Sequence, residues 1–258
     1  MKFALYSDLH VELMHYQSWQ PEPLDVDVVI LAGDIGKHTQ GLSWASKVFQ
    51  AWPNNPQVIY VAGNHEYYEA SLDLLDDLRR PTWQHVGIEF LEQDTLQLPG
   101  VRILGCTLWS KFDLYGGSAE AMALARNRIS DYWLIRNKQG KRLEPQETLE
   151  LHHQAVAWLE AELAQPYEGR TLVVTHFAPH RGCVAPQHEG SLLTSYFVTD
   201  LSWLMEKHSV DVWCHGHTHT SCDFIAENGC RVISNQRGYL KEVEAGISGF
   251  RPNLVFEI

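Results

Sequence analysis

The 258-residue sequence lacks any apolar segment long enough to cross a lipid bilayer. Its first residues include the charged Lys2 and Asp8, which leave no room for the apolar centre of a signal peptide. Basic charge is also scarce, because 20 Lys and Arg stand against 32 Asp and Glu, for a formal net charge of −12. This balance disfavours a protein that grips long nucleic acids. We therefore expect a cytoplasmic protein that binds neither membranes nor long nucleic acid.

Cysteine pairs are a second absence. The five cysteines are odd in number and contain no Cys-x-x-Cys pair, which predicts free thiols rather than a disulfide framework. The segment from Cys214 to Cys222 also contains three histidines, but it is too compact for the pair-loop-pair spacing of a structural zinc finger. No linker rich in Pro, Gly or Ser divides the chain, and no internal repeat is present. With 45% hydrophobic residues, residues 1–258 are predicted to form one domain.

Short apolar runs rich in Val, Ile and Leu are the main positive signal, and such runs are typical of strands covered on both faces. Helical spacing between the early runs predicts βαβ units, while three runs in the middle of the chain are expected to form an antiparallel meander. The expected helices are 42–52, 71–79, 119–129 and 146–163. The expected strands are 2–6, 27–32, 58–62, 172–174, 210–213, 232–234 and 254–258, with the meander at 88–91, 96–98 and 101–106.

Polar motifs follow five of these runs. They are Asp8-Leu9-His10, Gly33-Asp34, Gly63-Asn64-His65-Glu66, Thr175-His176 and Gly216-His217-Thr218-His219. Ligands bind at the carboxyl ends of strands in open α/β sheets, so these side chains are expected to meet in one cleft. Crowded oxygen and nitrogen ligands are costly to bury unless cations neutralise them. The pattern predicts a hydrolase with two divalent metal ions.

Alone, Asp8-Leu9-His10 and Gly33-Asp34 are weak signals, since Gly-Asp commonly marks a turn and a single histidine is more often a surface or core residue. Gly63-Asn64-His65-Glu66 is a stronger signal, and Gly216-His217-Thr218-His219 is stronger still. Their joint appearance in one order carries the prediction. Histidines outside the motifs, such as His15, are expected to have no metal-binding role, and His152 and His153 are expected on a solvent-facing side of their helix. For Glu66 two roles remain open, namely orienting His65 or capping a helix.

As a set, these motifs resemble the calcineurin-like metallophosphoesterase family, and the resemblance runs from Asp8 to His219. It implies an α/β fold, a four-layer α/β/β/α sandwich of two mixed β-sheets flanked by helices. It also implies a dinuclear metal centre with seven ligands. Asp8, His10 and His219 would bind one metal, Asn64, His176 and His217 the other, and Asp34 both. Mn²⁺ is the expected metal, with Fe, Zn and Ni as alternatives that the same ligand types accept.

The resemblance implies hydrolysis of a phosphoester, with Asp34 and His65 as catalytic residues. A metal-bridging hydroxide would attack phosphorus, and His65 would protonate the leaving group. The Asp-Arg-Gly motif of protein serine/threonine phosphatases is missing, because Gly33-Asp34 continues as Ile35-Gly36-Lys37. Without that arginine clamp for a monoester dianion, we expect a phosphodiesterase for a small or nucleotide-like diester.

Three alternatives remain: a phosphomonoesterase or an enzyme of mixed specificity, a nuclease acting on strand ends, and a catalytically inactive metal-binding scaffold. His180 and Arg181 follow His176 closely, and Arg237 follows the strand at 232–234, so these three residues are candidate substrate contacts. The expected partner is a small phosphoester, with nucleotides as one class. The sequence predicts neither an oligomeric state nor a role for residues 108–145.

Overall fold

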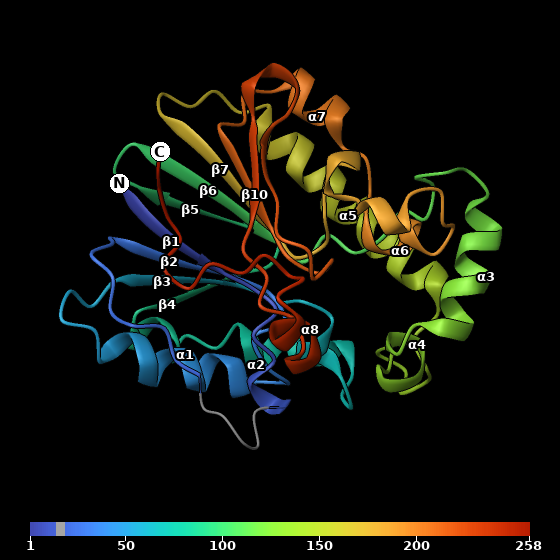
Figure 1. Cartoon of the computed structure of the whole chain (residues 1–258), viewed down its shortest axis with the longest axis horizontal. Helices are drawn as coiled ribbons and strands as arrows, with labels where there is room; N and C mark the ends of the chain where they lie inside the picture. The colour runs from blue at the N-terminus through green and yellow to red at the C-terminus, as the bar shows by residue number, and fades with distance from the viewer. Residues whose placement is uncertain (14–18) are drawn as a thin grey trace.

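The computed structural model describes residues 1–13 and 19–258, and His15 lies outside these ranges. Two β-sheets pack face to face, with helices on both outer sides (Figure 1). The strands of the first sheet, in spatial order, are β11 (Val255–Glu257), β1 (Lys2–Tyr6), β2 (Val28–Ala32), β3 (Gln57–Val61) and β4 (Ile88–Leu91). Those of the second are β5 (Asp94–Leu98), β6 (Val101–Cys106), β7 (Arg170–Thr175), β8 (Val212–His215), β10 (Arg231–Ser234) and β9 (Asp223–Ile225).

Both sheets are mixed. Strands β1, β2, β3 and β4 run parallel to one another, and β11 pairs antiparallel with β1. In the second sheet β6, β7, β8 and β10 are parallel, while β5 and β9 are antiparallel edges. The predicted α/β/β/α sandwich is therefore confirmed.

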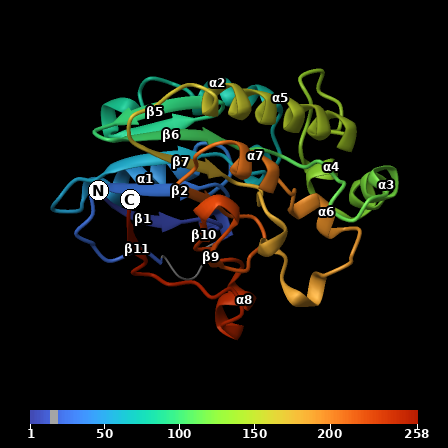
Figure 2. The same cartoon turned by 90° about the horizontal axis from the view of Figure 1, so that it is seen from above.

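Helices α1 (Gln40–Gln50) and α2 (Leu75–Leu78) lie against the first sheet, and α5 (Pro145–Leu163) and α7 (Ser202–Lys207) lie against the second (Figure 1). Both Figure 1 and Figure 2 place α3 (Ser118–Arg128), α4 (Asp131–Leu134) and α6 (Thr194–Phe197) beyond the carboxyl ends of the strands. A last helix, α8 (Leu240–Ala245), follows β10. Within the described ranges, no helix combines the length and apolar character needed to span a bilayer.

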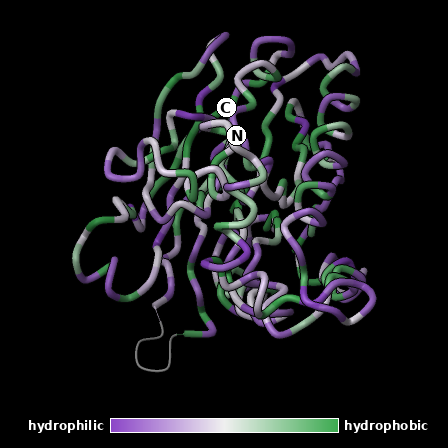
Figure 3. The backbone as a smooth tube through the Cα atoms, turned by 90° about the vertical axis from the view of Figure 1, so that its right-hand side faces the viewer, coloured by the Kyte–Doolittle hydropathy of each residue, from purple (hydrophilic) through white to green (hydrophobic). Residues whose placement is uncertain are grey.

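The strands form because their apolar residues are buried on both faces. Phe3, Leu5, Ile30, Val174 and Ile233 fill the space between the sheets, as part of a core separate from the one under the helices. The hydropathy colouring shows hydrophobic stretches (green) in the interior of the molecule and many hydrophilic ones (purple) along its outer turns (Figure 3). Burial of this area is the main source of stability, and it fixes the carboxyl ends of the parallel strands in one region.

Two expectations about local structure were wrong. β4 pairs in parallel with β3 in the first sheet. Of the three strands expected to form a meander, only β5 and β6 pair antiparallel, so the predicted meander does not exist. The chain crosses between the sheets at Glu92 and Gln93, where Gln93 adopts φ = 53°. On α5, His152 is buried and its Nδ1 lies 3.1 Å from the Leu108 carbonyl oxygen, whereas His153 is exposed as expected.

Candidate metal centre and active site

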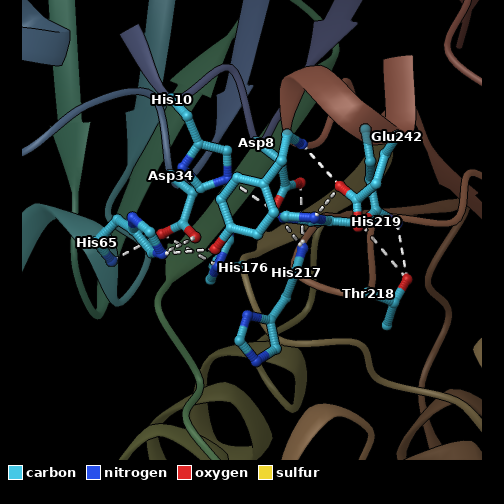
Figure 4. Close-up of polar contacts among 12 residues, drawn as sticks. Asp8, His10, Asp34, His65, His176, His217, Thr218, His219 and Glu242 are labelled. Atoms are coloured by element: carbon cyan, nitrogen blue, oxygen red, sulfur yellow. Dashed lines mark hydrogen bonds and ion pairs between the residues drawn. The ribbon is translucent and has the colours of Figure 1, made fainter. Parts of the chain in front are cut away.

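The polar motifs lie where parallel strands end. Asp8 follows β1, Asp34 follows β2 and Asn64 follows β3 in the first sheet, while His176 follows β7 and His217 follows β8 in the second. The side chains of Asp8, Asp34 and His176 lie close together in Figure 4, and the ligand atom of His217 groups with those of Asp34 and His176. One cleft thus receives ligands from both sheets.

The candidate ligand atoms form two linked groups. One group holds Asp8, His10 and His219, and the other holds Asp34, His176 and His217, with ligand atoms within 4.8 Å of one another in each. Asp34 also groups with His10 and His65. The amide oxygen of Asn64 lies 3.1 Å from His176 Nε2. All seven residues predicted as ligands are therefore brought together, with Asp34 between the two groups.

Unpartnered nitrogens show that this arrangement fits two cations. The Nε2 atoms of His10 and His219 lie 3.2 Å apart. His217 Nε2 is buried and has no hydrogen-bond partner within the described part of the chain. Imidazole nitrogens held this way are costly unless they share an ion or proton. Imidazole, carboxylate and amide donors suit Mn, Fe, Zn and Ni.

The backbone at the ligands is strained. Asp8, His10, Asp34, His217 and His219 all have positive φ, between 48° and 75°. This region is sparsely populated by residues other than glycine and costs about 1–3 kcal/mol where it is occupied. Five of the seven candidate ligands share it, so the connections after the strands are shaped for the site.

Glycines make room for the ligands at two places. A Cβ on Gly63 would lie 2.2 Å from Asp34 Oδ1 and 2.7 Å from His176 Nε2. A Cβ on Gly33, which has φ = 85°, would lie 2.4 Å from His176 Nδ1. Any side chain at either position would push Asp34 or His176 out of place.

Glu66 has neither of the roles expected from the sequence. Its buried carboxylate accepts hydrogen bonds from the backbone N–H groups of Asp34 at 3.0 Å, Ile35 at 2.9 Å and Gly63 at 2.7 Å, and from the Tyr60 hydroxyl at 2.7 Å. Burial, with the nearby Asp34 carboxylate, raises the pKa of Glu66 to about 7. Glu66 joins the loops after β2 and β3, and so fixes Asp34 relative to Asn64.

His65 is held in one orientation by Glu12. Its Nδ1 lies 3.2 Å from Glu12 Oε1, and its ring stacks on Tyr68 with 4.0 Å between the ring centres. Its Nε2 then points into the cleft, 3.2 Å from the Tyr239 hydroxyl and 3.9 Å from Asp34 Oδ2. Burial lowers the pKa of His65, but Asp34 and Glu12 outweigh this effect and raise it overall. When Nε2 carries the proton, it is positioned to donate toward the cleft.

Two further carboxylates orient ligands. Asp131 accepts a hydrogen bond of 2.9 Å from Asn64 Nδ2, which turns the Asn64 oxygen toward His176. Glu242 on α8 lies 2.7 Å from His219 Nδ1, which leaves His219 Nε2 facing His10. Carboxylates that bind the second nitrogen of a histidine ligand typically fix its tautomer. Glu12, Asp131 and Glu242 belong to no sequence motif, so their roles at the site were not expected.

Beside these residues lies a cleft of about 430 Å³. Asp34, Asn64, His65, His217 and His219 form its polar side, together with Tyr68, Asp131, Thr218, Tyr239 and Glu242. The other walls combine hydroxyl-bearing residues, among them Ser130, Ser191 and Thr194, with apolar residues, among them Ile129, Val184, Leu193, Phe197 and Val198. Arg128 and His188 add basic groups to these walls.

The three predicted substrate contacts have other surroundings. His180 Nε2 lies 2.9 Å from Glu227 Oε2, and Arg181 donates to the Leu114 carbonyl and covers the Tyr115 ring. Arg237 is 7% exposed and its guanidinium carbon lies 5.3 Å from the centre of the Trp19 ring. The cleft lining, as described, includes none of the three. It includes Arg128 and His188 instead, which no motif singled out.

The fold has two mixed sheets covered by helices, and both sheets place candidate metal ligands at the carboxyl ends of their strands. This combination defines a class of hydrolase with a two-metal centre. Residues 1–221 match the family model of the calcineurin-like phosphoesterases. The chain belongs to this family, whose members are metal-dependent phosphoester hydrolases.

Several known proteins are similar to this chain in sequence or structure. An uncharacterized protein of Acanthamoeba polyphaga mimivirus is 26% identical over 92% of this chain and 90% of its own length. The solved structure of phosphopantetheinyl hydrolase from Mycobacterium tuberculosis has a TM-score of 0.72 at 21% identity and covers 95% of this chain and 92% of that one, which shows a shared fold. A dimetal phosphatase from Danio rerio has a TM-score of 0.48 at 18% identity, over 92% and 87% of the two chains.

Proposed function

We propose that the protein hydrolyses small phosphodiesters, with Mn²⁺ as the preferred metal. One observation carries the proposal: the cleft beside the metal ligands has apolar residues in its walls and, among its described lining residues, a single guanidinium, from Arg128. A diester carries one negative charge and a second organic substituent. An apolar wall accommodates that substituent, whereas a monoester dianion favours a bidentate arginine clamp.

The chain's own residues divide the work. Bound divalent cations supply Lewis-acid stabilisation of the phosphoryl oxygens and lower the pKa of a coordinated water. Asp34 holds the two ligand groups together, and Asn64 adds a neutral donor that preserves the positive charge of the centre. His65, held by Glu12 and Tyr68, directs Nε2 toward the cleft and donates a proton to the departing oxygen.

The substrate is expected to be a small molecule with one elongated or apolar substituent. The structural neighbour of TM-score 0.72 is a phosphopantetheinyl hydrolase, so a phosphopantetheinyl ester is one candidate. Nucleotide diesters are a second candidate, because Tyr68, Phe197 and Tyr239 offer aromatic faces in the cleft.

The first test compares bis(4-nitrophenyl) phosphate with 4-nitrophenyl phosphate. Protein stripped of metal is reloaded with Mn²⁺, and kcat/KM is measured for both esters. Asp34→Ala serves as the inactive control, and its metal content is measured in parallel. We expect the diester to be hydrolysed with the higher kcat/KM, and a panel of nucleotide and phosphopantetheinyl diesters follows.

Two other results would replace this proposal. A higher kcat/KM for the monoester would assign a phosphomonoesterase, in which Arg128 and His188 bind the dianion. No turnover of any ester, with two metal ions verified per chain, would assign a metal-binding scaffold.

A further inference from the structure

A second group of metal-ligand side chains lies outside the centre described above. It consists of Cys183, His215 and Cys222, whose ligand atoms all lie within 4.8 Å of one another. Cys183 is at the end of a short 3-10 helix (Arg181–Cys183) after β7, His215 is the last residue of β8, and Cys222 precedes β9. The ligands therefore come from the connection after β7, the end of strand β8 and the connection between β8 and β9.

The geometry is that of a small thiophilic site. His215 Nε2 lies 3.3 Å from Cys222 Sγ. A tetrahedral zinc ion has bonds of about 2.3 Å to sulfur and about 2.0–2.1 Å to nitrogen, which separates neighbouring ligand atoms by distances of this size. Two thiolates and an imidazole select Zn²⁺ over the harder Mg²⁺ or Mn²⁺.

Neighbouring groups already orient two of these side chains. His215 Nδ1 lies 2.9 Å from the Gly216 carbonyl oxygen, so Nδ1 carries the proton and the lone pair of Nε2 faces Cys222. The Cys222 N–H donates to Ser234 Oγ at 3.0 Å, which holds Cys222 against β10. A second nitrogen bound to a carbonyl is the usual arrangement of a metal-binding histidine.

Burial also matches a structural ion. Cys183 is 3% exposed and His215 is fully buried, while Cys222 is partly exposed, which leaves a path for metal entry.

We propose that Cys183, His215 and Cys222 bind a zinc ion distinct from the dinuclear centre. This ion ties the connection after β7, which contributes Cys183 and Val184 to the cleft wall, to the connection between β8 and β9 that contains His219. It leaves one coordination position for water or another ligand. The proposal does not depend on which phosphoester is hydrolysed.

Cobalt substitution distinguishes this site from the dinuclear one. Co²⁺ occupies zinc sites and gives an intense near-ultraviolet charge-transfer band only where a thiolate is bound. The dinuclear ligands contain no sulfur, so the band reports on this cluster alone. Reduced protein is titrated with Co²⁺ and the band is followed in wild type, Cys183→Ala, Cys222→Ala and the control Cys230→Ala, whose thiol is buried away from the cluster.

We expect one thiolate-bound cobalt per chain in wild type and Cys230→Ala, and loss of the band in both other variants. A second measurement needs no substitution: alkylation followed by mass spectrometry should show that Zn²⁺ protects Cys183 and Cys222. Absence of the band in reduced wild type, its persistence in the two variants, or equal alkylation with and without Zn²⁺ would overturn the proposal. The proposal would also be overturned if Cys183 and Cys222 form a disulfide in the isolated protein and the protein still binds no Zn²⁺ once that disulfide has been reduced.

Discussion

Single side chains in the cleft depend on neighbours that are distant in sequence. His65 is the main example, because Glu12 binds one nitrogen, Tyr68 covers the ring and the other nitrogen faces the cleft. A proton donor needs this combination of a fixed ring and a free nitrogen.

Removing the His65 imidazole should therefore slow only those reactions that need a proton. For His65→Ala we expect kcat to fall by about 10²–10⁴-fold on diesters with poor leaving groups, which is the usual contribution of general acid catalysis. Esters with good leaving groups should lose much less, and the metal content should stay unchanged. His153→Ala, at an exposed position, is the control. A loss of equal size on good and poor leaving groups would contradict a role in proton donation.

Glu242 should act on metal binding through His219. In Glu242→Gln the charge that orients His219 Nδ1 is removed while the shape is kept. Substitution of such a carboxylate typically costs 10–100-fold in metal affinity or activity. We expect a weakened affinity for one of two metal ions, measured by titration of stripped protein, and Glu244→Gln on the same helix is the matched control. An unchanged affinity would show that His219 needs no partner.

The residues of the site differ in how far the sequence predicts them. Asp8, Asp34 and His176 follow apolar runs directly, so their positions at strand ends follow from local pattern. Glu12 and Glu242 act only because the fold brings them to His65 and His219. No local spacing encodes such contacts, and the same holds for Cys183 beside Cys222.

At the scale of elements, buried carboxylates fix the connections between strands relative to one another. Glu66 binds the loops after β2 and β3, and Glu92 has a similar place where the chain passes from β4 to β5. Glu92 Oε2 accepts hydrogen bonds from the Thr107 N–H at 2.9 Å and from the Thr107 hydroxyl at 2.6 Å. It thereby links the crossing segment to the end of β6.

Glu92 predicts a dependence of stability on pH. Burial raises its pKa from 4.5 to about 7 even though the Thr107 hydrogen bonds oppose this shift. Between these two values the folded protein binds more protons than the unfolded chain. The free energy of unfolding should therefore fall as pH rises from about 4.5 to about 7, by up to about 3 kcal/mol from this group.

Glu92→Gln keeps an acceptor for Thr107 but does not ionise, so it should be more stable than wild type above neutral pH and similar to it near pH 4.5. Chemical denaturation across this pH range measures the difference, and Glu89→Gln on β4 is the control. If the free energy of unfolding depends on pH in the same way for wild type and Glu92→Gln, ionisation of Glu92 does not destabilise the folded protein.

Most of the expected strands exist in the structure, because a buried parallel strand is a short apolar run that can be recognised locally. Pairing is less local. The sequence of residues 88–91 is compatible with a strand in either sheet. Their pairing with β3 places them in the first sheet. The short elements β9 and α8 were not expected at all, since three to six residues carry too little periodicity.

For the whole molecule, both sheets contribute ligands, so metal binding couples the two halves of the sandwich. Asp8 and Asp34 come from the first sheet and His176, His217 and His219 from the second. A ligand that binds only the folded state stabilises it by an amount that grows with its concentration over Kd.

Removing metal should therefore lower Tm. With metal at about 100 times Kd, linkage gives about 2.7 kcal/mol, or a fall in Tm of about 5–10 °C for a domain of this size on chelation. Thermal unfolding of stripped protein, with and without added Mn²⁺, measures the change, and Mg²⁺ is the control ion. If chelation leaves Tm unchanged, the ligands are held in place by the protein alone.

The positive φ angles at five candidate ligands imply that metal binding also affects the stability of the protein in the cell. A chain that reaches its folded state before metal arrives keeps that backbone strain without compensation, and its strand-end loops are the segments expected to open first. Cellular proteases act on such open states. Metal supply should then set the lifetime of the protein as well as its activity, so that cells starved of the preferred ion contain less of it.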